Sequence, residues 1–375
     1  MRPAAAKLGC YIPLRQFSSS GARHAATTRR VYAVKGQQLT DAGFRARVTG
    51  GSQSSIPLHI QRPEEGAPHM PPMDRWFTYP AGDPAAADFS WQLRAADIYT
   101  NHINYELVLD ETMQSSHPGN PLFQFAEWLS RRSEEGNSLR HLALAHQAAD
   151  LRKVDLVRRT PFVEPGNKPY FHQFLSSLSL FSEALKYNLK TRQPRDRVGQ
   201  LYIAQTPLEM LPPEMHADAH RPHLLDLLAI DVYNSSIWMG LQPTYTPFHN
   251  DPNDNLFCQV RGSKVVRLLP PERGNALFFQ VKAEIAAQLK REGRISLFRP
   301  ASPGVRGEEM MQWREREAFH KAVWSEQAPV GILEARLNPG DMLFIPRKWW
   351  HSVQSVGTRG ALNVSMNWWF RWTQG

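Results

Sequence analysis

Short runs of apolar residues, separated by polar turns, fill the second half of the chain and predict β-strands. The runs occupy residues 201–205, 232–239, 256–260, 265–269, 332–337, 342–345, 351–356 and 361–370. Many short strands at regular spacing favour an antiparallel barrel or a double-sheet jelly roll. We therefore expect a mainly β fold of the double-stranded β-helix kind, surrounded by helices.

Helical spacing of apolar residues occurs before these strands and once between them. Pro121–Arg132 and Phe174–Asn188 have apolar residues three and four positions apart, which predicts helices in an α-rich N-terminal region. The same spacing returns at about 275–325, where a helical insert is expected to interrupt the strands. Ile56–Ile60 predicts a short edge strand.

One turn between strands has the composition of a hairpin. Gly262 and Ser263 separate two apolar runs, and a Gly-Ser pair in this position predicts a tight β-hairpin. Pro270 and Pro271 then end the second strand, because proline has no N–H to donate to a neighbouring strand.

Positive charge is concentrated at the N-terminus. The chain has 375 residues and a net charge of +9, and residues 1–36 hold seven of its 44 lysines and arginines but no acid. The other 37 basic residues nearly balance the 35 acidic ones, so composition gives little reason to expect a nucleic-acid partner. Two cysteines exclude a disulfide framework and a cysteine-based zinc site.

Residues 1–36 are rich in Arg, Ala and Ser, which is typical of a mitochondrial transit peptide. We expect a matrix location, with a disordered basic tail as the alternative. The chain then divides into this arm, a mixed α/β region at 37–195 that packs on the barrel, and a catalytic barrel at 196–375. No apolar run approaches the roughly 18 residues of a membrane-spanning helix, so no span is expected.

A candidate metal site lies in the strand-rich half. His249 and Asp251 are two residues apart, and in an extended chain such residues point to the same face. His351, at the start of a later strand, is the expected third ligand. Two imidazoles and one carboxylate on one side of an octahedron are the ligand set of non-haem Fe(II) oxygenases.

A second His-x-Asp pattern serves as a comparison. His216 and Asp218, followed by His220 and His223, have the same spacing but no apolar strand before them. We expect this segment to be a solvated loop, with a surface metal site as the lesser alternative.

The sequence around the candidate site resembles the JmjC family over about residues 200–370. The matching motifs occur in order: Trp238-Met239-Gly240, Thr246-Pro247-Phe248-His249-Asn250-Asp251, Asn255-Leu256, Gln259-Val260, Gly262-Ser263-Lys264, Asn338-Pro339-Gly340-Asp341, Phe344-Ile345-Pro346, Trp350-His351 and Asn367-Trp368-Trp369. The sequence is most similar to the small JmjC-only hydroxylases, which include factor-inhibiting HIF and the JmjC arginyl and lysyl hydroxylases. The resemblance implies a cupin-like JmjC barrel.

The resemblance also implies a binding site for 2-oxoglutarate. Lys264 would pair with the distal carboxylate of this co-substrate, Thr246 would donate a hydrogen bond to the same group, and Tyr202 would complete the clamp. A lysine in a hairpin and a tyrosine in the core are the structural alternatives for Lys264 and Tyr202.

Four further residues are implied around the iron. Asn255 and Asn367 would lie near the metal and the other end of 2-oxoglutarate, and Trp238 and Trp369 would line the pocket. Both tryptophans could instead be ordinary core aromatics.

The implied chemistry is hydroxylation with Fe(II), 2-oxoglutarate and O2, which yields succinate and CO2. The acidic ligand is Asp251 rather than the glutamate frequent in JmjC histone demethylases, and no chromatin-reader module is visible. Both points favour hydroxylation of a protein side chain over demethylation. No counterpart of the dimerisation helices of factor-inhibiting HIF follows the last predicted strand, so a monomer is expected.

Three alternatives stay open. Arg192, Arg195 and Arg197 form a local basic patch that would suit a hydroxylase of a tRNA base. Demethylation of a histone or another protein at lysine is a second alternative. A non-catalytic cupin-like binding module is the third, although such a module could lose its metal ligands and Lys264 freely, and this chain has kept them all.

Overall fold

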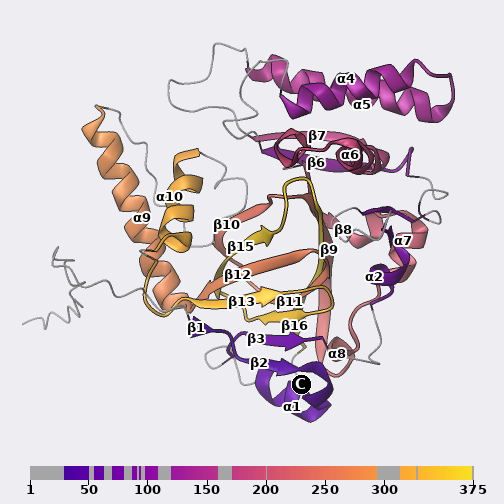
Figure 1. Ribbon diagram of the computed structural model, residues 1–375. Helices are drawn as coiled ribbons and strands as arrows, with labels where there is room; N and C mark the ends of the chain where they lie inside the picture. The colour runs from indigo at the N-terminus through magenta and orange to yellow at the C-terminus, as the bar shows by residue number, and fades with distance from the viewer. Residues whose placement is uncertain are drawn as a thin grey trace, which may run out of the picture.

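The computed structural model describes residues 29–49, 55–62, 70–79, 87–90, 93, 98–108, 120–158, 171–199, 201–293, 313–326 and 328–373. Two large β-sheets form the centre of this part of the chain, and helices surround them (Figure 1). The smaller of these sheets has the strand order β1-β13-β12-β15-β10. The larger has the order β2-β3-β14-β11-β16-β9-β8-β6-β7.

The strands predicted from the apolar runs are present. Their bounds are β8 (Leu201–Pro207), β9 (Ile230–Leu241), β11 (Asp254–Arg261), β12 (Ser263–Leu269), β13 (Leu333–Leu337), β14 (Met342–Ile345), β15 (Trp350–Val356) and β16 (Leu362–Trp372), and a further strand that no apolar run predicted, β10 (Tyr245–Asn250), joins them. They are antiparallel to their neighbours in this set, which confirms the expected jelly roll with a helical surround.

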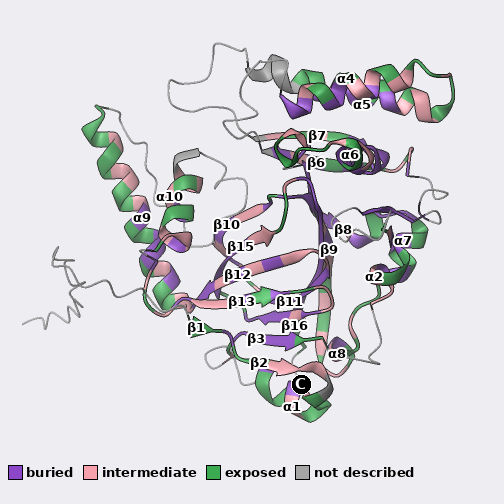
Figure 2. Cartoon of the chain, in the orientation of Figure 1, coloured by how far each residue is buried: buried purple, intermediate pink, exposed green. Residues whose placement is uncertain are grey.

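Alternation along the strands divides the apolar side chains between two cores. Phe257 and Leu343 from the larger sheet pack with Val266 and Val353 from the smaller one, in the space between the sheets. The opposite face of the larger sheet, which includes Leu256, packs in a separate core under the helices. Figure 2 shows the result, with buried residues along the strands and exposed residues on the outer sides of the helices.

The predicted hairpin at Gly262 and Ser263 is wrong. β11 pairs with β14 and β16 in the larger sheet, whereas β12 pairs with β13 and β15 in the smaller one. Gly262 has a φ of 66° and lies between these strands, in a conformation that glycine adopts without a steric penalty. The short turn therefore carries the chain from one sheet to the other.

The N-terminal region extends both sheets. Its strands are β1 (Arg29–Arg30), β2 (Ala33–Lys35), β3 (Leu58–Gln61), β6 (His102–Val108) and β7 (Phe171–Ser177), with a small separate pair, β4 (Phe77–Thr78) and β5 (Asp88–Phe89). β6 joins β8 of the barrel, so this region continues the larger sheet.

Two expectations for the N-terminal region need correction. β3 was expected to be an edge strand, but it pairs with β2 on one side and β14 on the other. The arm was expected to reach residue 36, but β1 and β2 already pair with β13 and β3. Regular structure thus begins by Arg29, and the transit-peptide prediction for residues 1–28 lies outside the described residues.

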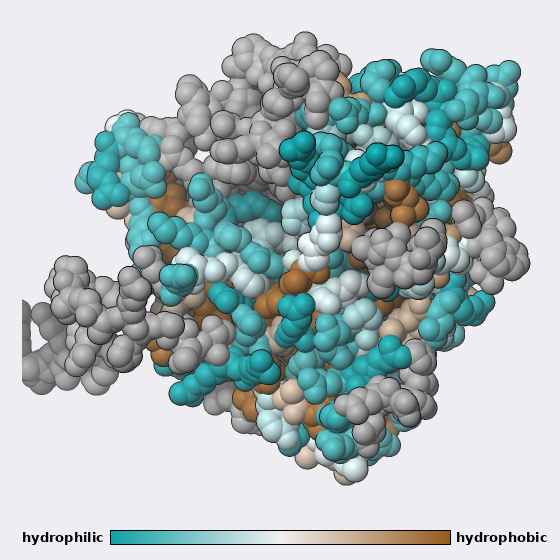
Figure 3. Space-filling view, viewed as in Figure 1, coloured by the Kyte–Doolittle hydropathy of each residue, from teal (hydrophilic) through white to brown (hydrophobic). Residues whose placement is uncertain are grey.

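Helices cover the larger sheet at the end that the N-terminal strands β6 and β7 form. α4 (Pro121–Ser133) confirms one prediction, and the Asn120 side chain caps it by accepting from the Leu122 N–H at 2.9 Å. α5 (Leu139–Arg158) packs beside α4, and Figure 3 shows hydrophilic side chains over the visible side of this pair. α6 begins at Ser179, not Phe174, because Phe174 belongs to β7 and pairs with Tyr105.

The helical insert packs against the smaller sheet. It consists of α9 (Pro271–Arg291) and α10 (Trp313–Trp324), and α9 begins directly after β12 ends, as the two prolines predict. Phe278 of α9 and Phe319 of α10 stack at 5.5 Å between ring centroids and pack on Trp350 of β15. This places a rigid support directly behind the strand that carries His351.

Shorter helices complete the surround. They are α1 (Asp41–Val48), α2 (Pro71–Arg75), α6 (Ser179–Lys190), α7 (Pro213–Asp218) and α8 (His223–Asp226). None of the helices in the described ranges combines the length and the apolar character that crossing a membrane requires.

Candidate metal centre and its pocket

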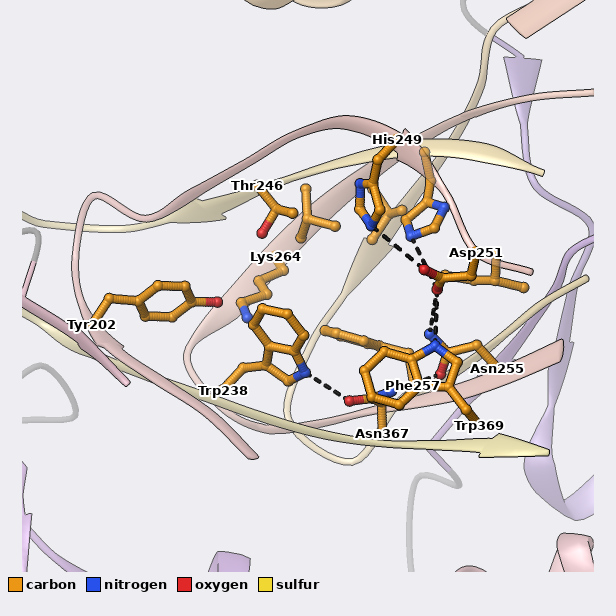
Figure 4. A pocket seen from close by; sticks show the side chains of 14 residues that line it. Tyr202, Trp238, Thr246, His249, Asp251, Asn255, Phe257, Lys264, Asn367 and Trp369 are labelled. Atoms are coloured by element: carbon orange, nitrogen blue, oxygen red, sulfur yellow. Dashed lines mark hydrogen bonds and ion pairs between the residues drawn. The ribbon is translucent and has the colours of Figure 1, made fainter. Parts of the chain in front are cut away.

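The three predicted metal ligands come together between β10 and β15. His249 on β10 is in register with His351 on β15, and Asp251 follows directly after β10. Nε2 of His249 lies 3.9 Å from Oδ1 of Asp251, and Nε2 of His351 lies 3.8 Å from Oδ2 of the same carboxylate. One ligand atom from each residue lies within 4.8 Å of the others (Figure 4). Two atoms bound at about 2 Å to one ion are at most about 4 Å apart, and both imidazole nitrogens lie within this limit of the Asp251 carboxylate, so the three residues fit a single cation.

Backbone carbonyls fix the tautomer of both imidazoles. Nδ1 of His249 is 2.8 Å from the Pro247 carbonyl oxygen, and Nδ1 of His351 is 3.0 Å from that of Trp349. A carbonyl can only accept, so Nδ1 carries the proton and Nε2 keeps its lone pair. Both lone pairs are therefore available on the side of Asp251, as metal-bound histidines require.

The charge states also suit a metal. Burial, aided by the neighbouring His249, lowers the pKa of His351 to about 4, so this imidazole is neutral near pH 7. Burial works against ionisation of Asp251, but the imidazoles of His351 and His249 and the N–H donors of Trp369 and Asn255 together hold the pKa of its carboxyl below 3.8. Neutral imidazoles and an ionised carboxylate are the forms that bind metal ions.

The centre belongs to a cavity that all ten predicted site residues line. The side chains of His249 and Asp251 are 19% and 15% exposed, whereas Lys264 is 2% exposed. His249 and Asp251 therefore stand near the mouth of the cavity, whereas His351, which is 4% exposed, and Lys264 lie deeper.

Lys264 on β12 is a buried cation whose contacts are aromatic. Its Nζ atom lies 5.3 Å from the centroid of the Phe257 ring and 6.0 Å from that of Tyr202. Within the described ranges no carboxylate faces it, and burial lowers the pKa of its ammonium to about 7. Burying an ammonium costs free energy unless an opposite charge pairs with it, so the floor of the cavity favours the binding of an anion.

Tyr202 and Thr246 stand beside this lysine. Burial raises the pKa of the Tyr202 hydroxyl far above its usual value, and Thr246 hydrogen-bonds to it. Both hydroxyl groups are therefore protonated donors. Gly240 makes room for the ring, because a Cβ atom there would lie 2.5 Å from Cδ2 of Tyr202.

The remaining four predicted residues form hydrogen bonds on the opposite wall. Nε1–H of Trp238 donates to Oδ1 of Asn367 at 2.6 Å, and Nδ2–H of Asn367 donates to Oδ1 of Asn255 at 3.1 Å. Nε1–H of Trp369 donates to Oδ2 of Asp251 at 2.9 Å.

Sequence reasoning missed four apolar residues of the cavity. They are Phe257, Val266, Ile345 and Val353. Phe257, Val266 and Val353 lie two positions after Asn255, Lys264 and His351 on the same strands, so strand alternation alone would have placed these three in the cavity. Ile345 lies on β14, which has no predicted site residue.

The second His-x-Asp pattern is not a loop, which corrects the prediction. His216 and Asp218 lie on the short helix α7. Asp218 is buried, and it accepts hydrogen bonds from Nη1 of Arg75 and Nε1 of Trp76. Its carboxylate is thereby committed to the packing of α2 and α7. The His249, Asp251 and His351 cluster is the metal-ligand group found among the described residues.

Comparison with known proteins agrees with the jelly-roll fold described above. A model of the cupin-like domain matches residues 132–374. The chain is 26% identical to lysine-specific demethylase JMJ30 of Arabidopsis thaliana over 56% of this chain and 43% of that protein. It is 26% identical to Jumonji C domain-containing protein 5 of Drosophila melanogaster over 62% and 53%, and 28% identical to lysine-specific demethylase 8 of Danio rerio over 59% and 47%. The chain thus spans about half the length of these relatives.

Proposed function

The chain belongs to the cupin-like domain family, and on this premise we propose that it carries a JmjC domain and is an Fe(II)- and 2-oxoglutarate-dependent oxygenase. The observation that supports this most directly is that one cavity holds both a cluster of metal ligands and a buried ammonium. A His-Asp-His cluster with an ionised carboxylate lies at one end, and an ammonium without a carboxylate partner among the described residues lies at the floor.

The donor set fits Fe(II). His249, His351 and Asp251 offer two imidazole nitrogens and a carboxylate oxygen, and this facial set leaves ligand positions open on the metal. Bound Fe(II) would activate O2, with 2-oxoglutarate supplying two electrons and leaving as succinate and CO2. The protein would contribute fixed ligands, a cavity closed at one end and a wall of indole and phenyl rings that limits water.

The floor of the cavity fits the distal carboxylate of 2-oxoglutarate. Lys264 would supply the charge, and the hydroxyl groups of Tyr202 and Thr246 would donate hydrogen bonds to the same oxygens. An arriving carboxylate would also raise the pKa of the Lys264 ammonium back toward its usual value, because opposite charges favour ionisation.

The substrate we propose is a protein side chain, which would be hydroxylated. The aspartate ligand and the near-neutral body of the chain support this choice over histone tails and nucleic acid. In the patch suggested for tRNA, Arg192 and Arg195 are exposed, whereas Nε of Arg197 donates to the Thr191 carbonyl.

Lysine demethylation is the second candidate, and the names of two relatives favour it. Hydroxylation of an N-methyl carbon gives a product that releases formaldehyde, whereas side-chain hydroxylation leaves the new oxygen on the protein. Formaldehyde release from methylated peptides, measured beside the mass gain of one oxygen in mitochondrial proteins, distinguishes the two candidates.

The basic test of the proposal is co-substrate turnover. The full chain with Fe(II), 2-oxoglutarate and O2 should form succinate, and chelation of the metal should stop it. A protein that binds neither Mn(II) nor 2-oxoglutarate would contradict the proposal, because binding of both precedes any choice of substrate.

We also propose that the basic N-terminal residues direct the chain to the mitochondrial matrix. The proposal is supported by the composition of residues 1–36, in which basic and small residues are frequent and acids are absent.

A further inference from the structure

Two indole groups send hydrogen bonds toward the same oxygen atom of Asp251. Trp369 donates to Oδ2 directly, at 2.9 Å. Trp238 reaches it through two amides: Trp238 donates to Asn367, Asn367 donates to Asn255, and Nδ2–H of Asn255 donates to Oδ2 at 3.4 Å. Figure 4 shows this row of side chains along one wall of the cavity.

The two ends of the row fix the direction of every bond in it. An indole N–H can only donate, and an ionised carboxylate can only accept. Between them, each amide must turn its oxygen toward Trp238 and its nitrogen toward Asp251. The orientation of Asn255 and Asn367 is thus set by chemistry at both ends, and the row can point in one direction only.

The consequence concerns which carboxylate oxygen is left for the metal. Each carboxylate oxygen faces one imidazole, since Oδ1 lies 3.9 Å from Nε2 of His249 and Oδ2 lies 3.8 Å from Nε2 of His351. Both N–H donors bind Oδ2, and among the described residues Oδ1 receives no hydrogen bond, so its lone pairs stay available. Groups that hydrogen-bond to a metal ligand typically fix its orientation and strengthen the site.

We propose that Trp238 and Asn367 are positioning residues that act through Asn255 to hold Oδ2 of Asp251 and present Oδ1 to the metal. This inference rests on the proposed metal centre. Trp238 also packs toward Tyr202, with 6.2 Å between ring centroids, so the row connects the wall of the 2-oxoglutarate pocket to a metal ligand.

Trp238→Phe tests the row, because it removes one N–H and keeps an aromatic ring. The row of hydrogen bonds should lose its fixed direction, and the affinity for Co(II), measured without 2-oxoglutarate, should fall about tenfold. The visible absorption of the Co(II) form, which reports ligand geometry, should change as well. Asn367→Asp should weaken binding further, because a carboxylate cannot donate to Asn255.

Trp372→Phe is the matched control. Nε1 of Trp372 also donates to a carboxylate, Oδ2 of Asp254, at 2.8 Å, but Asp254 is not a metal ligand. This variant should keep the Co(II) affinity and spectrum of the wild type. Thermal melting of the metal-free proteins separates positioning from folding, because Trp238→Phe should change metal binding far more than its melting temperature.

The outcomes are distinct. If the wild type binds Co(II) and Trp238→Phe binds it with the same affinity and spectrum, the positioning role of the row is contradicted, but the proposed metal centre is not. If Trp238→Phe lowers the melting temperature without changing the spectrum, its role is structural and the inference also fails. If the wild type binds no Co(II), both the proposed metal centre and the positioning role of the row are contradicted.

Discussion

Replacement of Lys264 by methionine should have opposite effects on the empty protein and on co-substrate binding. In the folded protein, burial lowers the pKa of this ammonium from 10.5 to about 7. Each pKa unit corresponds to about 1.4 kcal/mol, so keeping Lys264 charged costs the folded state up to roughly 5 kcal/mol. Methionine fills a similar volume without a charge, so Lys264→Met should raise the free energy of unfolding of the metal-free protein at pH 7.

The pH dependence has a definite sign. The pKa of Lys264 is lower in the folded than in the unfolded state, so the unfolded state binds more protons between pH 7 and 10.5. The cost is complete below about pH 7 and disappears as the pH rises toward 10.5. Urea unfolding at several pH values should therefore show a stability difference between variant and wild type that shrinks with rising pH. Lys321→Met, on an exposed position of α10, is the control and should show no such trend.

The same variant should bind 2-oxoglutarate poorly. Removing one partner of a buried charge pair typically costs about 2–5 kcal/mol, which is a loss of affinity of at least roughly thirtyfold. Calorimetry with Mn(II) in place of Fe(II) measures this without turnover. If Lys264→Met leaves both the stability at pH 7 and the 2-oxoglutarate affinity unchanged, Lys264 is not a buried cation that awaits an anion, and the co-substrate site must be elsewhere.

Three other predictions follow from the site and the N-terminus. His249→Ala should abolish Mn(II) binding and succinate formation, and turnover that persists in a metal-checked sample would refute the ligand cluster. Gly240→Ala should weaken 2-oxoglutarate binding, because its Cβ would displace the ring of Tyr202; unchanged affinity with an unchanged melting temperature would remove Tyr202 from the clamp. Residues 1–36 fused to a fluorescent reporter should send it to mitochondria, whereas a cytosolic reporter would end the targeting proposal.

The strands and the metal ligands were predictable because each depends on local periodicity. His249 and Asp251 share a face by strand geometry, and His351 was placed by the start of its own strand. The register that sets His249 opposite His351 was not predictable, because it depends on pairing between segments about a hundred residues apart.

The wrong predictions have a common physical origin. A Gly-Ser turn suits a hairpin and also a turn that moves the chain between sheets, and pairing with β14 and β15 decides between them. Phe174 lies three to four positions from later apolar residues and so mimics a helix, but its pairing with Tyr105 places it in a strand. Asp218 looked solvated because its partners, Arg75 and Trp76, are distant in the sequence.

The balance of charge in the cavity bears on which ligand it can hold. With a metal bound, Asp251 and Lys264 carry the formal charges among the described residues that line the cavity, because His351 is neutral and His249 must have no proton on Nε2 to be a ligand. A divalent cation, one ammonium and one carboxylate together carry two net positive charges. Burying that excess is unfavourable, and a ligand with one negative charge would leave half of it uncompensated. A dicarboxylate long enough to reach from the mouth to the floor neutralises both ends at once, which is the physical reason to expect 2-oxoglutarate rather than a monocarboxylic acid in this pocket.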